Sequence, residues 1–280
     1  MSNPVCINID DHVATVTLSR GNKMNALDKA TFEGLVQAAQ SLQQDPTVRA
    51  VVIHGSGENF CSGLDKSMFE MFSNGNKLAD RTHGITNLFQ QVAWAWHELK
   101  VPVIAAVEGY CIGGGLQIAS GADMRYVHPD ARMSIMEIKW GLIPDMAGTQ
   151  LWRSFVKQDL LRELTYTGEV FDGTTASDYG FATRLTDTPL ELAQKTARSI
   201  AEKSPDAIRA SKVLLNQQDY LSFEQGLLLE SELQDEIIGQ PNQIEAVFAN
   251  MDKRKPVFSS ADEQSAPTPA ETRIGSRASA

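Results

Sequence analysis

The 280-residue sequence contains no apolar run that approaches the roughly 20 residues an α-helix needs to cross a bilayer. Its first residues, MSNPVCINIDDHV, lack the basic segment followed by an apolar stretch that marks a secretory signal. Positive charge is also scarce, because the net charge is −10 and no dense basic run occurs. We therefore expect a cytoplasmic protein without membrane or nucleic-acid partners.

Cysteine and histidine patterns are absent too. Cys6, Cys61 and Cys111 are odd in number and widely spaced, so neither a disulfide framework nor a zinc site is indicated. We expect three small buried side chains in a reducing compartment. The five histidines form neither an HxH nor an HExxH pattern, and no metal site is expected. No GxSxG segment occurs, so Ser62 is expected to be a loop residue and not a nucleophile.

The chain does contain a recurring order of strand, loop and helix. A hydrophobic fraction of 42% and a charged fraction of 21% are those of a globular protein. Apolar periodicity predicts strands over 5–9, 12–18, 49–55 and 101–109, and helices over 27–45, 84–99 and from 113 onward. Asp28 is the expected N-cap of the first helix. This alternation favours an α/β fold with largely parallel strands.

From residue 189 the strand signal ends and four helices are predicted, over 189–204, 205–218, 222–239 and 242–254. The last helix has an apolar stripe that so small a unit cannot bury, so an interface is its expected destination. Residues beyond 258 are small, polar and proline-containing, which predicts disorder. The expected organisation is therefore a core over 1–200, a helical oligomerisation region over 201–258 and a tail over 259–280.

A glycine run, in the segment GGGLQIASGAD at 113–123, enters one of these helices. The start of a helix leaves backbone N–H groups unpaired, and glycine lets a ligand atom approach them closely. Helix–strand packing explains many such runs equally well. A second small-residue loop, FCSGLD at 60–65, follows another buried strand and could direct an N–H to the same place. Two N–H groups converging on one oxygen form an oxyanion hole.

Four motifs, NKMNALD, FCSGLD, GYCIGGGLQIASGADMRY and MEIKWGLIPDMAGTQ, occur in that order. Through them residues 5–258 resemble the enoyl-CoA hydratase/isomerase (crotonase) superfamily. The resemblance implies a crotonase-like spiral of ββα turns with a C-terminal helical trimerisation region, and a homotrimer or dimer of trimers. It implies an acyl-CoA substrate whose thioester oxygen lies between the N–H groups of Leu64 and Gly114. Coenzyme A enters as part of the substrate, and no metal or redox cofactor is implied.

The resemblance also locates the groups that move protons. Hydratases of this superfamily hold a water with two glutamates, and the matching positions here are Gln117 and Glu137. An amide orients a water or a substrate but does not exchange a proton at neutral pH. Asp145 lies eight residues beyond Glu137 (145 − 137 = 8), a pairing similar to that of the dienoyl-CoA isomerases. Those enzymes carry a further aspartate at the position of Gln117, and a second isomerase type uses one glutamate at the position of Glu137.

Two carboxylates facing one apolar pocket do not both ionise readily, which leaves one acid and one base. We therefore expect double-bond isomerisation through a thioester enolate, with Glu137 and Asp145 sharing the two proton transfers in an unassigned order. Asp145 could instead cap the helix that follows it. The runner-up is hydration of a 2-enoyl-CoA; an acyl-CoA hydrolase or decarboxylase and a non-catalytic binding relative are further alternatives.

Eleven residues are expected to contact the substrate or its coenzyme A: Lys23, Met24, Ala26, Leu27, Ser62, Gly63, Asp65, Ile112, Gly113, Gln117 and Trp140. Lys23 is either a phosphate contact or an exposed loop lysine, and Trp140 either shapes the acyl pocket or packs. The apolar residues that follow GLDK, namely Met68, Phe69, Met71 and Phe72, either form a wall of that pocket or pack as part of a helix.

Overall fold

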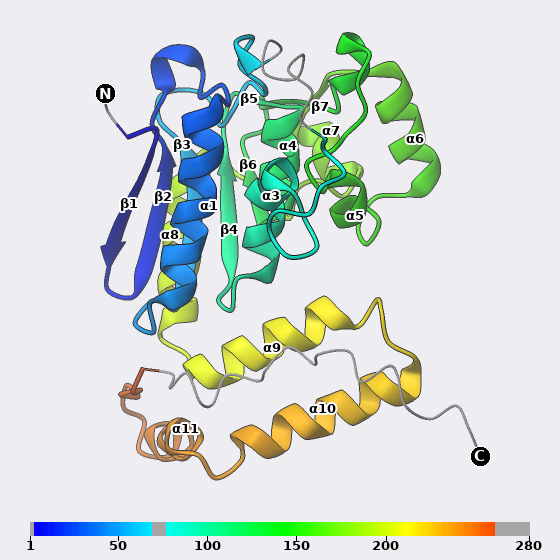
Figure 1. The fold of residues 1–280 in the computed structure, drawn as a ribbon. Helices are drawn as coiled ribbons and strands as arrows, with labels where there is room; N and C mark the ends of the chain where they lie inside the picture. Colours follow the sequence, from blue (N-terminus) through cyan, green and yellow to red (C-terminus); the bar gives the residue numbers. More distant parts are fainter. Residues whose placement is uncertain (1–2, 69–76, 261–280) are drawn as a thin grey trace, which may run out of the picture. The chain divides into compact units, whose positions relative to one another are not determined.

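The computed structural model describes residues 3–68 and 77–260 (Figure 1). The chain divides into two compact units, residues 1–199 and 200–280. Phe69, Met71 and Phe72, which the sequence offered as pocket residues, lie outside the described residues, as does the expected tail from residue 261 onward.

Unit 1 is built on a sheet that has six strands in the described residues, in the order β1-β2-β3-β4-β6-β9. The strands are β1 (Val5–Asp10), β2 (Val13–Leu18), β3 (Ala50–Gly55), β4 (Val103–Val107), β6 (Met124–Val127) and β9 (Arg184–Leu185). Only the β1–β2 hairpin is antiparallel, and each later pair of this sheet is parallel. The predicted α/β class with largely parallel strands is therefore confirmed.

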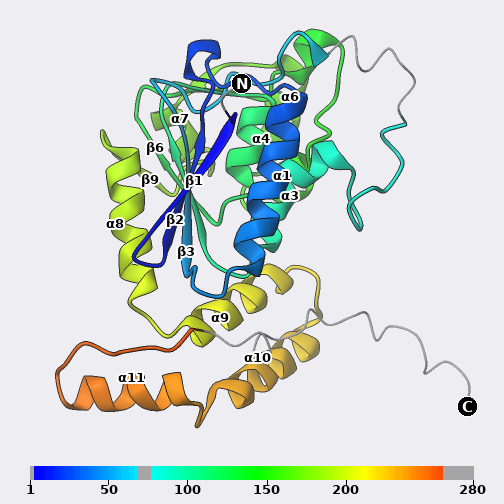
Figure 2. The same ribbon diagram turned by 60° about the vertical axis from the view of Figure 1, so that its left-hand side comes forward.

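A smaller sheet in the described chain joins β5 (Tyr110–Ile112), β7 (Arg132–Ser134) and β8 (Phe171–Asp172). The helices of this unit are η1 (Gly21–Lys23), α1 (Lys29–Gln44), α3 (Leu88–Glu98), α4 (Gly114–Ser120), η2 (Glu137–Trp140), α5 (Gly148–Trp152), α6 (Gln158–Thr167), α7 (Gly173–Asp178) and α8 (Pro189–Ala201). Helices α1 and α3 cover one face of the large sheet and α8 covers the other (Figure 2). The parallel strands are therefore buried on both faces, which explains the continuous apolar run of β4.

The starts of α1 and α3 are set by local capping. Asp28 accepts a hydrogen bond from the Thr31 N–H at 2.9 Å, so the predicted N-cap is confirmed. Helix α3 begins four residues later than expected from the periodicity. Asn87 and Gln90 form a reciprocal capping box there, which ends the preceding loop at Asn87.

The entrance to α4 requires glycine for two separate reasons. Gly113 has φ 52° and ψ −117°, a backbone conformation that side chains disfavour. A Cβ on Gly115 would lie 2.5 Å from the carbonyl oxygen of Cys61, so α4 packs directly on the loop that follows β3. Helix packing therefore accounts for Gly115, while Gly113 and Gly114 lie at the cavity described below.

Unit 2 consists, within its described residues, of α9 (Pro205–Gln217), α10 (Phe223–Ile237) and α11 (Pro241–Met251). With α8, these are the four helices predicted from residue 189 onward, and that prediction is confirmed. The last helix, α11, exposes Ile244, Val247, Phe248 and Met251, and α10 also exposes Phe223, Leu227 and Leu228. Assembly through such residues stays a prediction, as do the expected domain boundaries.

The cysteines follow the sequence expectation at two positions of three. Cys61 and Cys111 are fully buried, and burial raises the pKa of the Cys61 thiol to about 12 and that of Cys111 well above its ordinary value. The expectation of a buried Cys6 is wrong, since this side chain is exposed on β1. Strand β1 is at the edge of the sheet, and its residues from Cys6 to Asp10 are all exposed.

Replacing Gly115 by alanine is expected to lower the free energy of unfolding by about 1–3 kcal/mol, because the new methyl group overlaps the Cys61 carbonyl. The matched control is Gly226→Ala in α10, where no atom lies within 4 Å of the added Cβ. There the change is expected to stabilise the helix by about 0.5–1 kcal/mol. Urea unfolding at one protein concentration measures the free energy of unfolding of both variants. A change of the same sign in Gly115→Ala and Gly226→Ala would contradict the close packing of α4 on the Cys61 carbonyl.

Candidate active site

The two glycine-containing loops open into a cavity of about 500 Å³. Its wall includes residues from both loops, from α3, from η2 and from the segment that precedes α5. Ten predicted site residues line it: Ser62, Gly63, Leu64, Ile112, Gly113, Gly114, Gln117, Glu137, Trp140 and Asp145. The structure therefore brings together residues that are up to 83 positions apart (145 − 62 = 83).

Five predicted contact residues do not line the cavity: Lys23, Met24, Ala26, Leu27 and Asp65. Lys23 and Met24 are exposed, whereas Leu27 is fully buried and pairs with Leu64 as a parallel bridge. Asp65 accepts hydrogen bonds from Arg20 and from Ser67, which lower its pKa. The Leu27 N–H donates to the Gly63 carbonyl and the Asp65 N–H donates to the Leu27 carbonyl, so these residues join the segment before α1 to the FCSGLD loop.

Leu64 and Gly114, the two residues expected to supply N–H donors, both line the cavity. The two loops approach closely, since a Cβ on Gly63 would lie 3.9 Å from the Gly114 nitrogen. Within residues 3–68 and 77–260, no atom accepts a hydrogen bond from either N–H. Gly114 is also the first residue of α4, where an N–H has no partner inside the helix.

Gln117 lies one turn inside α4 and is 1% exposed. Its Oε1 accepts hydrogen bonds from the backbone N–H groups of Met146 and Gly148, each at 2.9 Å. Both backbone groups can only donate, so the orientation of the amide is fixed and its NH₂ group faces Glu137. The Nε2 atom donates to Glu137 Oε1 at 2.6 Å. Gln117 therefore holds Glu137 in place and provides the hydrogen-bond acceptor for two backbone N–H groups at the start of α5.

Glu137 is the first residue of η2 and lies over the glycine loop. A Cβ on Gly113 would be 3.4 Å from its Oε1. Burial raises the pKa of the Glu137 carboxyl above its ordinary value, and hydrogen bonds from its own N–H and from Gln117 oppose that rise. Its Oε2 atom is covered from solvent and has no hydrogen-bond partner in the described chain. This oxygen is therefore available to a bound molecule.

Asp145 does not cap the following helix, so that alternative is wrong. Helix α5 has Ala147 as its N-cap residue, and the Gly148 N–H donates to Gln117 instead. Asp145 Oδ1 accepts a hydrogen bond from Gln90 Nε2 at 2.7 Å. The half-buried carboxylate thus faces the cavity while tied to α3.

Seven apolar residues complete the wall and were not predicted from the sequence: Phe32, Leu78, Phe89, Met136, Leu142, Ile143 and Met146. Leu142, Ile143 and Met146 belong to the motif that contains Asp145, which was the available signal. Trp140 lines the cavity and is 53% exposed, so it contributes to the wall at its rim. Met68 is buried in the core instead.

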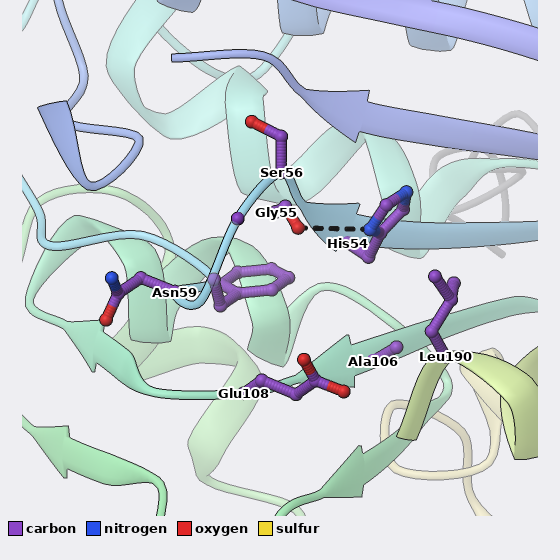
Figure 3. Close-up of a pocket in the computed structure, with 9 residues that line it drawn as sticks. His54, Gly55, Ser56, Asn59, Ala106, Glu108 and Leu190 are labelled. Carbon is purple, nitrogen blue, oxygen red and sulfur yellow. Dashed lines mark hydrogen bonds between the residues drawn. The ribbon is translucent and has the colours of Figure 1, made fainter. Parts of the chain in front are cut away.

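A second hollow of about 250 Å³ lies near the carboxyl ends of β3 and β4 (Figure 3). His54 borders it, but both ring nitrogens are engaged, with Thr17 Oγ1 and with the Gly55 carbonyl. Burial lowers the pKa of His54. This histidine is half-buried, and both of its ring nitrogens have partners within the fold.

No group of three or more His, Cys, Asp or Glu side chains in 3–68 and 77–260 is placed to hold a metal ion. No helix of those ranges combines the length and apolar character that crossing a membrane requires.

Comparison with known proteins gives one consistent family. The model described as Enoyl-CoA hydratase/isomerase matches residues 8–261. The chain is 32% identical over 261 residues to "Delta(3,5)-Delta(2,4)-dienoyl-CoA isomerase, peroxisomal" of Arabidopsis thaliana, covering 90% of this chain and 94% of the relative. It is 31% identical over 258 residues to "Short-chain-enoyl-CoA hydratase" of Clostridium acetobutylicum, covering 90% and 96%.

Solved structures agree with the sequence matches. The crystal structure of enoyl-CoA hydratase from Mycobacterium smegmatis has a TM-score of 0.81 to this chain at 26% identity, covering 91% of this chain and 99% of the other. The expected crotonase-like fold is therefore confirmed.

The environment of Glu137 predicts a pH-dependent stability. Its pKa is higher in the folded than in the unfolded chain, so its protonation stabilises the fold fully below the ordinary pKa of about 4.3. That contribution is lost as the pH rises through the folded-state value. Glu137→Gln stays neutral, so it is expected to unfold at higher urea concentration than the unchanged protein at pH 8, by a margin that closes towards pH 4.

The control is Glu163→Gln, the same charge change on the exposed face of α6, which is expected to stay within about 0.5 kcal/mol of the unchanged protein. A Glu137→Gln margin that is independent of pH would show that burial of this carboxyl does not strain the fold.

Proposed function

Because the chain belongs to the enoyl-CoA hydratase/isomerase family, we propose that it moves a double bond along an unsaturated acyl-CoA. The substrate class is a 3,5-dienoyl-CoA and the product a 2,4-dienoyl-CoA. The observation that carries the proposal is the single cavity lined by two carboxylate residues, Glu137 and Asp145, together with Leu64 and Gly114.

The two N–H groups supply the electrophilic part of the mechanism. Leu64 and Gly114 line the cavity, and neither N–H has a partner in the described chain, so a thioester oxygen placed between the two would accept two hydrogen bonds. Removal of a proton from C2 forms a dienolate whose negative charge falls on that oxygen. Donors that are already in place stabilise this charge more than they stabilise the neutral thioester. The proposed steps use coenzyme A only as part of the substrate.

The two carboxyl groups supply the proton transfers. Burial raises the pKa of Glu137, which favours the protonated acid, while Asp145 receives an N–H donor from Gln90. Asp145 therefore acts as the base that breaks the C2–H bond, and the electron pair of that bond enters the dienolate. Glu137 then gives its proton to C6, so that the double bonds end at C2 and C4. A matched acid and base are what a proton shift between two carbons requires.

Hydration is the second candidate because relatives at similar identity carry both names. Water addition of the two-glutamate kind needs a second group at position 117 that exchanges protons. Gln117 is an amide whose oxygen already accepts two hydrogen bonds. The arrangement therefore favours isomerisation over hydration. The exposed apolar residues of α10 support a further proposal, that the chain assembles into a homotrimer or a dimer of trimers.

Purified protein mixed with a 3,5-dienoyl-CoA is expected to produce the absorbance of a diene conjugated with the thioester. Glu137→Gln and Asp145→Asn are each expected to lower kcat by about 10²–10⁴-fold, because each removes one proton-transfer group. Asp130→Asn and Glu163→Gln, which remove exposed carboxylates, serve as controls with unchanged kcat.

A trans-2-enoyl-CoA assayed in parallel distinguishes the two candidates. If the unchanged protein removes the 2-enoyl absorbance and Asp145→Asn still does so, the reaction is hydration by Glu137 and not isomerisation. No reaction with either substrate would contradict both.

A further inference from the structure

A second glutamine, Gln90, holds the second carboxylate of the cavity. Gln90 is the third residue of α3 and lies 55 positions before Asp145 in the sequence. Its Nε2 donates to Asp145 Oδ1 at 2.7 Å. Each of the two carboxylates that line the cavity therefore receives one hydrogen bond from a glutamine, Glu137 from Gln117 and Asp145 from Gln90.

The orientation of the Gln90 amide is fixed by its other partners. Its Oε1 accepts from the Asn87 backbone N–H at 3.3 Å and from Arg81 Nη1 at 2.9 Å. An N–H and a guanidinium can only donate, so the oxygen of Gln90 must face them. The NH₂ group is then directed to Asp145.

Arg81 is itself held by backbone carbonyls. Its Nη2 donates to the Leu78 carbonyl at 2.7 Å and its Nε to the Ala79 carbonyl at 3.0 Å. Asn87 Nδ2 donates to the same Leu78 carbonyl at 2.7 Å. The guanidinium charge is thereby placed one amide away from Asp145, through a chain of two hydrogen bonds.

Few other charges face this carboxylate. Among the described residues, the ionisable side chains that line the cavity are Glu137 and Asp145. The amide that binds Glu137 accepts from two neutral backbone groups, whereas the amide that binds Asp145 accepts from a cation. A cation at the oxygen end of an amide strengthens the N–H donor at its other end. The two carboxylates are thus in different electrostatic environments.

We propose that Gln90 is a positioning residue that, with Arg81 behind it, fixes the orientation of the Asp145 carboxylate as the acceptor of the substrate proton. This inference rests on the proposed function, in which Asp145 is the base. Gln90 does not touch the reacting atoms in this account; it acts through Asp145.

The discriminating variant is Gln90→Glu. A glutamate keeps the acceptor for the Asn87 N–H and for Arg81, so the capping box of α3 is preserved. It removes the N–H donor and places a like charge beside Asp145, which makes ionisation of the base harder. The acidic limb of the kcat/KM profile against pH is expected to move about one unit higher, with the basic limb unchanged.

Two further variants accompany it. Arg81→Met keeps the Gln90 and Asp145 side chains and removes the cation together with its hydrogen bonds to the Leu78 and Ala79 carbonyls, so a smaller shift in the same direction is expected. It carries the test if Gln90→Glu does not fold. Gln91→Glu is the matched control, because Gln91 is the next residue of α3, accepts from Thr86 Oγ1 and does not contact Asp145. Its profile is expected to match that of the unchanged protein.

The outcomes are distinct. A moved acidic limb in Gln90→Glu and Arg81→Met, absent in Gln91→Glu, supports the inference. An equal loss of rate at every pH would identify Gln90 as structural only, and a profile like that of the unchanged protein would show that it has no role; either result overturns the inference and leaves isomerisation standing. An unchanged protein that is inactive with the dienoyl substrate would overturn the proposed function, and the assigned role of Gln90 with it.

Discussion

The buried amide of Gln117 connects three parts of the site. It extends from α4 and accepts hydrogen bonds from the N–H groups of Met146 and Gly148 at the start of α5. It also donates a hydrogen bond to Glu137. Leaving either N–H without a partner in this buried place would cost about 1–3 kcal/mol. Satisfying both fixes the amide in one orientation, and that orientation aims its donor at Glu137. A glutamate at position 117 could accept the same two bonds, but in its ionised form it could not donate the third.

The consequence for chemistry is a difference between two carboxylates in one cavity. Glu137 is tied to an amide that has neutral partners, and burial raises its pKa. Asp145 is tied to an amide that also binds Arg81. Two groups of the same chemical type therefore lie in different surroundings, which suits the proposed mechanism, in which one proton is removed and another is returned. In the proposed mechanism, the backbone N–H groups of Leu64 and Gly114 bind the thioester oxygen on which the negative charge of the intermediate falls.

Much of this arrangement could be predicted from the sequence, for identifiable reasons. The central strands are long and apolar, and Gln117 follows Gly114 by three residues on a helix, which places it towards the cavity. The strands of the smaller sheet have two or three residues each, too few for a periodic signal. Asp145 was open to interpretation as an N-cap because capping is judged from neighbours in the sequence. The acceptor for the Gly148 N–H at the start of α5 is instead the side-chain oxygen of Gln117, which lies 31 positions earlier in the sequence. Gln90 was missed for the same reason, since its partner is 55 positions away.

The central claim is that one carboxyl takes a proton from C2 and a different one delivers a proton to C6. The most direct test is a single turnover of 3,5-dienoyl-CoA carrying two deuterium atoms at C2, in ordinary water, with the product analysed by mass spectrometry and NMR. Two separate carboxyl groups predict a product that has lost one deuterium and carries an ordinary hydrogen at C6. Transfer of the C2 deuterium to C6 within the same molecule would mean that a single group moves the proton, and would contradict the division of roles between Glu137 and Asp145.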